Sequence, residues 1–214
     1  MRIIGDIHGN YEAYFNIIKD AEYSVQVGDM GFDYNPLKSI DDNHHGFIMG
    51  NHDNYDDYNF CSLTLYAYDM VDFFDIPFFY VTGSFSIDCL PRVANYALSG
   101  HKTWWYEEQL SQEELNSAVK FYEKFKPDLV ITHDCPLCVK DYVSTPQIMK
   151  DFGWPIDMVN RTQEALQRMY EIHQPKLWVF GHYHKDWTTM LGKTQFVCVA
   201  SEKYIDINED LDIL

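Results

Sequence analysis

Short apolar runs alternate with amphipathic polar stretches along most of this chain. Eight runs are rich in Val, Ile and aromatic side chains and have the length of buried strands. They cover residues 2–5, 24–28, 46–49, 77–81, 129–132, 177–180, 195–200 and 203–207. Strands that alternate with helical patterns indicate an α/β protein with helices packed on its sheets. Close spacing around residues 77–98 and 186–207 predicts hairpins, so antiparallel strands should join the parallel ones.

Three stretches have the apolar period of amphipathic helices. The first covers residues 10–21. The second covers residues 111–125 and begins with a capping-box sequence at Ser111. The third covers residues 156–173, and its predicted inward face includes Val159.

The bulk composition is that of an ordinary globular protein. With 214 residues and 46% hydrophobic side chains, the chain is long enough for one well-buried domain, which we expect to span residues 1–214. Its longest apolar runs are too short to cross a bilayer, and the first motif follows Met1 too closely for a signal peptide. We therefore expect a cytoplasmic protein with no membrane contact. The polar segments 33–45 and 53–75 predict loops or short helices near the functional site.

Charge and cysteine content narrow the choice of partners. The formal net charge of −17 argues against a broad electrostatic contact with nucleic acid, which depends on clustered Lys and Arg. A metal cluster could still attract a single phosphate locally. Five cysteines are an odd number, and free thiols are the expectation. We interpret Cys135 and Cys138 as part of a loop rather than as a zinc or redox pair.

Residue types that bind metals gather directly after five of the apolar runs. The five motifs are Gly5-Asp6-Ile7-His8-Gly9-Asn10, Gly28-Asp29, Gly50-Asn51-His52-Asp53, Thr132-His133-Asp134 and Gly181-His182-Tyr183-His184. Oxygen ligands mixed with imidazoles suit first-row divalent metals. Two Asp, one Asn and four His are too many for one tetrahedral ion but suit two ions that share a carboxylate. The sequence therefore predicts a two-metal hydrolase.

Each of these residues also has an ordinary structural interpretation when it is taken alone. Asp6 could cap the following helix, and Asn51-His52-Asp53 has the composition of a turn. His133 and His182 could be hydrogen-bonded core histidines. The metal-site interpretation is preferred because all of the motifs occur together, each after an apolar run.

The ordered set of five motifs resembles the calcineurin-like metallophosphoesterases over residues 5–184. The resemblance implies a four-layer α/β/β/α sandwich, in which two mixed β-sheets are flanked by helices. It also implies that one metal is held by Asp6, His8, Asp29 and His184, and a second by Asp29, Asn51, His133 and His182. Asp29 would bridge the two ions. In this family the residue at His52 protonates the leaving group or stabilises the transition state.

The same resemblance implies a metal-dependent phosphoesterase that acts on a phosphorylated small molecule or peptide. Water would attack phosphorus as a hydroxide that bridges two divalent ions. Manganese is the first expectation, and iron, zinc, nickel, cobalt and magnesium are alternatives. A phosphodiesterase, a nuclease or a dinucleoside polyphosphate hydrolase is a second interpretation. A non-catalytic scaffold of the same fold is disfavoured because every ligand type and His52 are present.

The chain departs from the pattern of the protein Ser/Thr phosphatases in this superfamily. Those enzymes have Asp-Arg-Gly after the second motif, whereas here Met30 follows Asp29. The acidic partner that orients His52 and the adjacent phosphate-binding Arg are therefore not at their usual positions. Asp33 and Asp53 are both candidates to orient His52.

A distal segment is similar to a subgroup of small prokaryotic or phage metallophosphoesterases. It comprises residues 83–88, Arg92 and residues 104–108. Arg92 is a candidate for binding the phosphate of the substrate. An ion pair that only supports the structure is the alternative role for this residue.

Overall fold

The strands form two mixed β-sheets in the computed structural model, which describes residues 1–72 and 76–214. The first sheet has the order β11-β1-β2-β3-β4, with β1 (Arg2–Ile4), β2 (Ser24–Gln26), β3 (His45–Ile48), β4 (Thr64–Leu65) and β11 (Tyr204–Asp206). The second has the order β5-β6-β7-β8-β10-β9, with β5 (Tyr68–Val71), β6 (Phe78–Val81), β7 (Leu129–Thr132), β8 (Leu177–Phe180), β9 (Trp187–Leu191) and β10 (Thr194–Cys198). The inner strands of both sheets run parallel, and the antiparallel strands β11, β5 and β9 lie at edges.

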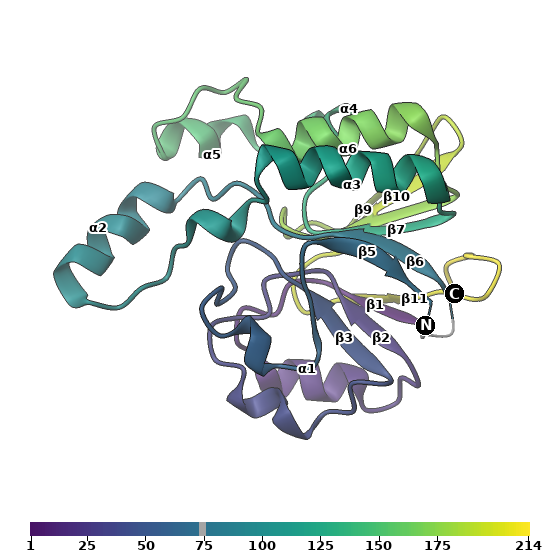
Figure 1. Ribbon diagram of the computed structural model, residues 1–214, viewed down its shortest axis with the longest axis horizontal. Coiled ribbons are helices and arrows are strands. Elements are labelled where there is room, and N and C mark those ends of the chain that lie inside the picture. Colours follow the sequence, from purple (N-terminus) through teal and green to yellow (C-terminus); the bar gives the residue numbers. More distant parts are fainter. Residues whose placement is uncertain (73–75) are drawn as a thin grey trace.

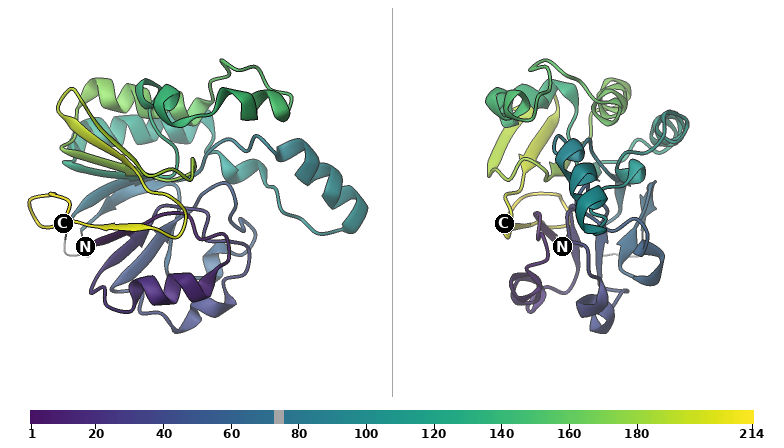
Figure 2. Two further views of the ribbon diagram at one scale, coloured as in Figure 1. Left: turned by 180° about the vertical axis from the view of Figure 1, so that it is seen from behind. Right: turned by 90° about the vertical axis from the view of Figure 1, so that its left-hand side faces the viewer.

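Helices cover the outer face of each sheet (Figures 1 and 2). Helix α1 (Tyr11–Ile18) packs on the first sheet, and α3 (Gln112–Phe125), α4 (Leu137–Val143) and α6 (Arg161–Ile172) pack on the second. Helices α2 (Cys89–Ser99) and α5 (Pro146–Asp151) project at the end of the sandwich opposite the two termini. Short 3-10 helices occur at Asn35–Ser39, Tyr58–Phe60 and Tyr106–Glu108. The predicted four-layer α/β/β/α architecture is confirmed.

Strand β8 shows how the sequence builds these layers. Leu177 and Val179 point into the apolar layer between the two sheets. Trp178 and Phe180 point the other way, into the layer beneath α3 and α6. All four side chains are buried, which is why this strand is a continuous apolar run and not an alternating one. No helix in the described part of the chain is long and apolar enough to span a bilayer.

All eight predicted strands are present, but one predicted hairpin is wrong. The antiparallel pair of β9 and β10 confirms the hairpin around residues 186–207. Strand β6, in contrast, pairs with the preceding β5 and in parallel with β7, while the residues after it form α2. Gly100 ends this helix in a left-handed conformation with φ of 72°, a common helix C-terminus. The apolar residues of this stretch therefore belong to a helix and not to a returning strand.

The three predicted helices are present, but the third is shorter than expected. It begins at Arg161 rather than at residue 156, because the side chain of Asn160 accepts a hydrogen bond from the backbone N–H of Gln163 and caps the helix there. Val159 lies outside the helix and is 42% exposed, so its predicted inward orientation is wrong.

The polar segments contain short helices, as predicted, and the second also contains strands. Segment 33–45 contains a 3-10 helix, and segment 53–75 contains another one. The second segment also contributes strands β4 and β5, which the sequence did not predict. Residues 73–75 of the prediction lie outside the described residues.

Candidate metal centre

The ends of five parallel strands carry the predicted metal ligands. Asp6 and His8 follow β1, Asp29 follows β2, Asn51 follows β3, His133 follows β7, and His182 and His184 follow β8. Three of these strands belong to the first sheet and two to the second. Because parallel strands present their carboxyl ends at the same edge, the fold brings residues up to 178 positions apart to one place.

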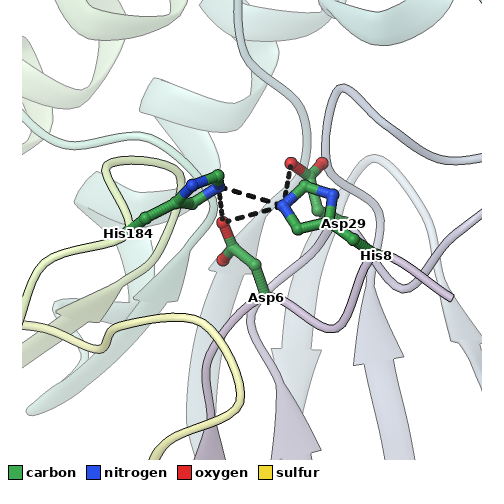
Figure 3. Close-up of side chains that lie close together, drawn as sticks. All are labelled: Asp6, His8, Asp29 and His184. Carbon is green, nitrogen blue, oxygen red and sulfur yellow. Dashed lines mark hydrogen bonds and ion pairs between the residues drawn. The ribbon is translucent and has the colours of Figure 1, made fainter. Parts of the chain in front are cut away.

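One group of ligand atoms comes from Asp6, His8, Asp29 and His184 and lies within 4.8 Å (Figure 3). His184 Nε2 is 3.0 Å from Asp6 Oδ2 and 2.9 Å from His8 Nε2. His8 Nε2 is also 3.8 Å from Asp29 Oδ2. The two carboxylates are buried, whereas both imidazoles reach solvent. The group is therefore accessible from one side.

A second group comes from Asp29, His133 and His182. His133 Nε2 is 3.2 Å from Asp29 Oδ1 and 2.9 Å from Asn51 Oδ1. The two oxygens of Asp29 thus face different groups, Oδ2 toward His8 and Oδ1 toward His133. Asp29 therefore belongs to both candidate groups.

Hydrogen bonds outside the cluster fix how two of these ligands point. His133 Nδ1 lies 2.9 Å from the carbonyl of Val27, which accepts its proton and leaves Nε2 facing the cluster. The amide nitrogen of Asn51 donates to Ser86 Oγ at 3.0 Å, which turns the amide oxygen toward His133. Oxygen and imidazole donors held in this way fit first-row divalent cations.

Backbone strain is concentrated at the ligands. His8, Asp29, His182 and His184 have φ values of 49°, 60°, 66° and 53°, in the left-handed region that side chains other than glycine disfavour. They make up half of the eight non-glycine residues with positive φ in the described part of the chain. Such strain persists where the surroundings impose it, and it clusters at functional sites.

Two positions that directly precede predicted ligands must be glycine, because a carboxylate packs closely against each of them. A Cβ atom at Gly50 would overlap the Asp29 carboxylate, and one at Gly181 would overlap the Asp6 carboxylate. Gly50 and Gly181 are therefore required because another predicted ligand approaches them, and not by the local turn alone.

The protonation of the cluster follows from its buried charges. Burial alone would raise the pKa of Asp29, but the neighbouring His133 holds it well below its usual range. Burial likewise opposes the charged form of His133, yet the Asp29 carboxylate raises the pKa of His133 to about 10. The hydrogen bond to Asp6 raises the pKa of His184. The opposite shifts in the pKa values of Asp29 and His133 favour the charged form of both partners.

Two further buried carboxylates brace the loops that carry the ligands. Asp53 accepts hydrogen bonds from the backbone N–H groups of Asp29, Gly31 and Gly50 at 2.7–2.9 Å. In the same way, Asp134 accepts hydrogen bonds from Ser84 at 2.7 Å, from Asn160 at 3.0 Å and from Tyr183 at 2.7 Å. Both carboxylates belong to the sequence motifs, and their supporting role was not predicted.

His52 lies beside the ligands with its side chain 30% exposed. Its backbone N–H donates to Asp29 Oδ1 at 2.7 Å, and its Nε2 is 3.8 Å from Asp88 Oδ2. Burial lowers its pKa, while Asp29 acts in the opposite direction. The two acidic residues considered from the sequence bind other groups instead of the His52 imidazole. The Asp53 carboxylate accepts from backbone N–H groups, and the Asp33 carboxylate accepts from Asn35. Asp88, in the distal segment, is the carboxylate that approaches His52.

Arg92 is buried and its guanidinium contacts several protein groups. It pairs with Glu108 at 2.7 Å, donates to Ser86 Oγ at 2.8 Å and to the Asn51 carbonyl at 3.2 Å, and also contacts the Thr103 carbonyl. Glu108 in turn accepts from Ser86, the residue that holds the Asn51 amide. The alternative considered for Arg92, an ion pair that supports the structure, describes this geometry.

The cysteines are free thiols, as expected. The predicted loop is correct for Cys135 but wrong for Cys138, which lies in α4. Burial raises the pKa of Cys135 and raises that of Cys138 to about 11. Both thiols are thereby kept protonated near neutral pH, which disfavours thiolate chemistry.

A cleft of about 280 Å³ opens beside the ligands. Asp29, Asn51, His52, His182 and His184 line it, together with residues from the loop after β6 and from α4, α5 and the segment before α6. The projecting helices α2 and α5 lie at this end of the molecule (Figure 1). A ligand in the cleft would therefore reach the metal ligands and His52 at once.

Comparison with known proteins agrees with this geometry. Residues 2–186 match the family model of the calcineurin-like phosphoesterases. Among solved structures, a Staphylococcus aureus protein described as "Putative 5'-Nucleotidase", in complex with alpha-ketoglutarate, is similar with a TM-score of 0.56 and 12% identity, over 99% of this chain and 51% of that chain. The present chain thus spans about half the length of that protein.

Two other solved structures are less similar. The Plasmodium protein GAP50, described as the anchor in the inner membrane complex, has a TM-score of 0.42 and 10% identity over 94% of this chain and 72% of its own. The sulfate thiohydrolase SoxB of Thermus thermophilus, in complex with glycerol, has a TM-score of 0.40 and 12% identity over 96% of this chain and 38% of its own. A search of curated proteins found no match.

Proposed function

This chain belongs to the calcineurin-like phosphoesterase family, and on that premise we propose that it hydrolyses phosphate esters of small molecules at a site for two divalent cations. Asp6, His8, Asp29 and His184 would hold one cation, and Asp29, Asn51, His133 and His182 the other. The observation that carries the proposal is the position of Asp29, whose two oxygens face the two groups of ligands. A non-catalytic scaffold has no need of strained backbone at four of these ligands.

In the proposed reaction, His52 and Asp88 have roles separate from that of the metal ligands. When bound, the cations supply Lewis acidity to the phosphoryl group and to the attacking water. A new P–O bond forms from water, and the P–O bond to the leaving group breaks. We assign His52 to protonate the leaving oxygen, since it lines the cleft next to Asp29. Asp88 lies within reach to orient it.

One set of assays tests which type of phosphate ester is hydrolysed and which metal supports the activity. Purified protein is stripped with a chelator and reloaded with Mn²⁺, Fe²⁺, Zn²⁺, Ni²⁺, Co²⁺ or Mg²⁺, and its metal content is measured. Each form is assayed with an aryl phosphomonoester, an aryl phosphodiester and a dinucleoside polyphosphate. We expect the monoester to be hydrolysed, with manganese the most effective ion. Protein that holds two ions per chain and hydrolyses none of the three substrates contradicts the proposal, and preferential diester cleavage would favour the phosphodiesterase alternative.

The role of His52 predicts a separation of binding from turnover. We expect His52→Ala to keep both metal ions while lowering kcat by about 10²–10⁴-fold, the usual contribution of a general acid. The loss should be greatest for substrates with poor leaving groups, which depend most on protonation. Rates for a series of aryl esters, read beside metal content, measure this. Release of metal by the variant would show instead that His52 is a ligand.

A further inference from the structure

The cleft beside the metal ligands has an apolar wall that phosphate hydrolysis does not itself require. This wall includes Phe85, Ile87, Val143, Ile148, Phe152 and Met158. It comes from the loop after β6, from α4 and α5, and from the segment before α6. These apolar side chains offer no hydrogen bonds to water in the cleft. An apolar body about the size of one aromatic ring would be removed from water against them.

Lys140, on helix α4, is a second unexplained feature of the same cleft. It lines the cleft, yet only 9% of the residue is exposed. Its ammonium group donates to the carbonyl of Met158. An ammonium carries three donors, and in the described part of the chain no carboxylate lies within ion-pair distance of it, although the chain has 33 Asp and Glu residues.

A buried cation without a counter-charge is costly unless something completes its shell. Lys140 is also the only Lys or Arg among the described residues that line the cleft. The cleft therefore offers the proposed cation site, an apolar wall, and one ammonium group with free donors. The Asp88 carboxylate also lines the cleft, but it faces Arg92 at 3.4 Å and His52 at 3.8 Å. A neutral sugar would leave the ammonium unpaired, and a cationic group would be repelled by it.

We propose that the cleft binds the leaving group of the substrate, and that this group has an apolar, ring-sized body and an oxyanion that pairs with Lys140. The inference rests on the proposed function, because it places the scissile phosphate at the metal ligands. The oxyanion is a carboxylate or a second phosphate, which have the same charge-assisted hydrogen bonding. After hydrolysis, the alcohol released would still carry this oxyanion.

Binding of non-hydrolysable phosphonates tests the inference apart from catalysis. Manganese-loaded protein is titrated with phenylphosphonate, 4-carboxyphenylphosphonate and 1,4-phenylenebisphosphonate, and each Kd is measured by calorimetry. We expect at least one of the two doubly functional probes to bind about tenfold more tightly than phenylphosphonate, the effect of one charge-assisted hydrogen bond. The stronger of the two identifies carboxylate or phosphate as the oxyanion. Equal Kd values for all three probes would overturn the proposal.

A matched pair of lysine variants tests the residue. Lys140→Met keeps the aliphatic stem and removes the charge, and we expect it to abolish the tenfold preference while leaving the Kd of phenylphosphonate within about twofold. Lys120→Met changes the net charge equally at an exposed position of α3 and should leave the preference intact. A preference that survives in Lys140→Met would assign the oxyanion to another group and overturn the proposal. Should Lys140→Met fail to fold, Lys140→Gln serves instead. It keeps a hydrogen-bond donor but removes the charge, and a tenfold preference that survives in it would overturn the proposal.

The apolar wall is tested separately at Ile148, which is 46% exposed and so tolerates a polar side chain. We expect Ile148→Ser to weaken binding of all three aryl probes severalfold while leaving methylphosphonate unaffected. Equal effects on methylphosphonate and phenylphosphonate would contradict the role of the wall.

Turnover separates failure of this inference from failure of the proposed function. If metal-loaded protein hydrolyses phenyl phosphate but shows no preference for the carboxylated ester, the function stands and the cleft inference fails. If the phosphonates show the Lys140-dependent preference while no ester is hydrolysed, the cleft is a binding site and the proposed function fails.

Discussion

At the scale of single residues, the site combines strained backbone with fixed side chains. Four ligands have positive φ, and hydrogen bonds to Val27 and Ser86 set the directions of His133 and Asn51. Each left-handed residue costs about 1 kcal/mol or more relative to glycine. This cost is retained because it aims the side chains at a common centre.

The shared carboxylate predicts the largest effect of any single substitution. We expect Asp29→Asn to lose both metal ions and to lower turnover by at least about 100-fold, because a neutral amide cannot bridge two cations. Elemental analysis and ester hydrolysis measure the two effects. Asp210→Asn makes the same change at an exposed position and should behave as the wild type. A variant that keeps two ions per chain would show that Asp29 does not bridge.

The strained backbone predicts a difference between two variants that both remove an imidazole. In metal-free protein, we expect His184→Gly to be more stable than His184→Ala by about 1 kcal/mol, because only glycine adopts φ of 53° without strain. Urea unfolding measures the difference. If the alanine variant were equally stable, the positive φ at this ligand would carry no cost.

At the scale of elements, helices α3 and α2 are stabilised by different interactions. Helix α3 has a complete capping box, in which the Ser111 hydroxyl accepts from the Glu114 N–H at 3.2 Å and the Glu114 carboxylate accepts from the Ser111 N–H at 2.8 Å. Helix α2 has no comparable support. Arg92 is its one buried residue in the described chain, whereas Leu90 and Leu98 are 62% and 89% exposed. The contacts of Arg92, which include its pair with Glu108, therefore help to hold this helix to the body of the protein.

The capping box predicts a measurable contribution to stability. We expect Ser111→Ala to lower the free energy of unfolding by about 1 kcal/mol, because the N–H of Glu114 loses its acceptor. Ser117→Ala provides the control within the same helix, since its hydroxyl bonds back to the Glu113 carbonyl and alanine is a better helix former. Urea unfolding of both variants measures the contrast. Equal losses would argue against capping.

At the scale of the whole molecule, the site joins the two sheets. Asp6, Asp29 and Asn51 come from the first sheet, and His133, His182 and His184 from the second. The apolar layer between the sheets holds these two sets in register, with Ile3 and Val25 on one side and Ile131 and Val179 on the other. Bound cations would add cross-links at the edge of this layer.

This placement predicts that metal stabilises the whole fold. At a free Mn²⁺ concentration about 1,000-fold above Kd, we expect about 4 kcal/mol of added stability per site. For a chain of 214 residues each occupied site then raises Tm by roughly 10 °C. We expect a single transition in calorimetry, as for one domain with a shared core, and no manganese effect in Asp29→Asn. Two separate transitions would contradict the single domain.

The sequence determined most of the strands and the types of the proposed ligands, because apolar runs and motifs are local features of the chain. Apolar runs predicted eight of the eleven strands in the described residues, but not β4 or β5, and each proposed ligand lies within a few residues of a strand end. Prediction failed at the hairpin around residues 77–98 and at Val159, where an apolar residue can belong to a strand, a helix or an exposed loop alike.

Only the tertiary structure decided which distant groups meet. The approach of Asp88 to His52, the hold of Ser86 on Asn51 and the pairing of Arg92 with Glu108 join residues 16 to 36 positions apart. The burial of Lys140 with no carboxylate of the described residues at ion-pair distance is likewise a property of the folded chain. Periodicity reports which face of an element is apolar, whereas these contacts depend on how separate elements pack. That packing is set by the sum of many weak contacts across the molecule.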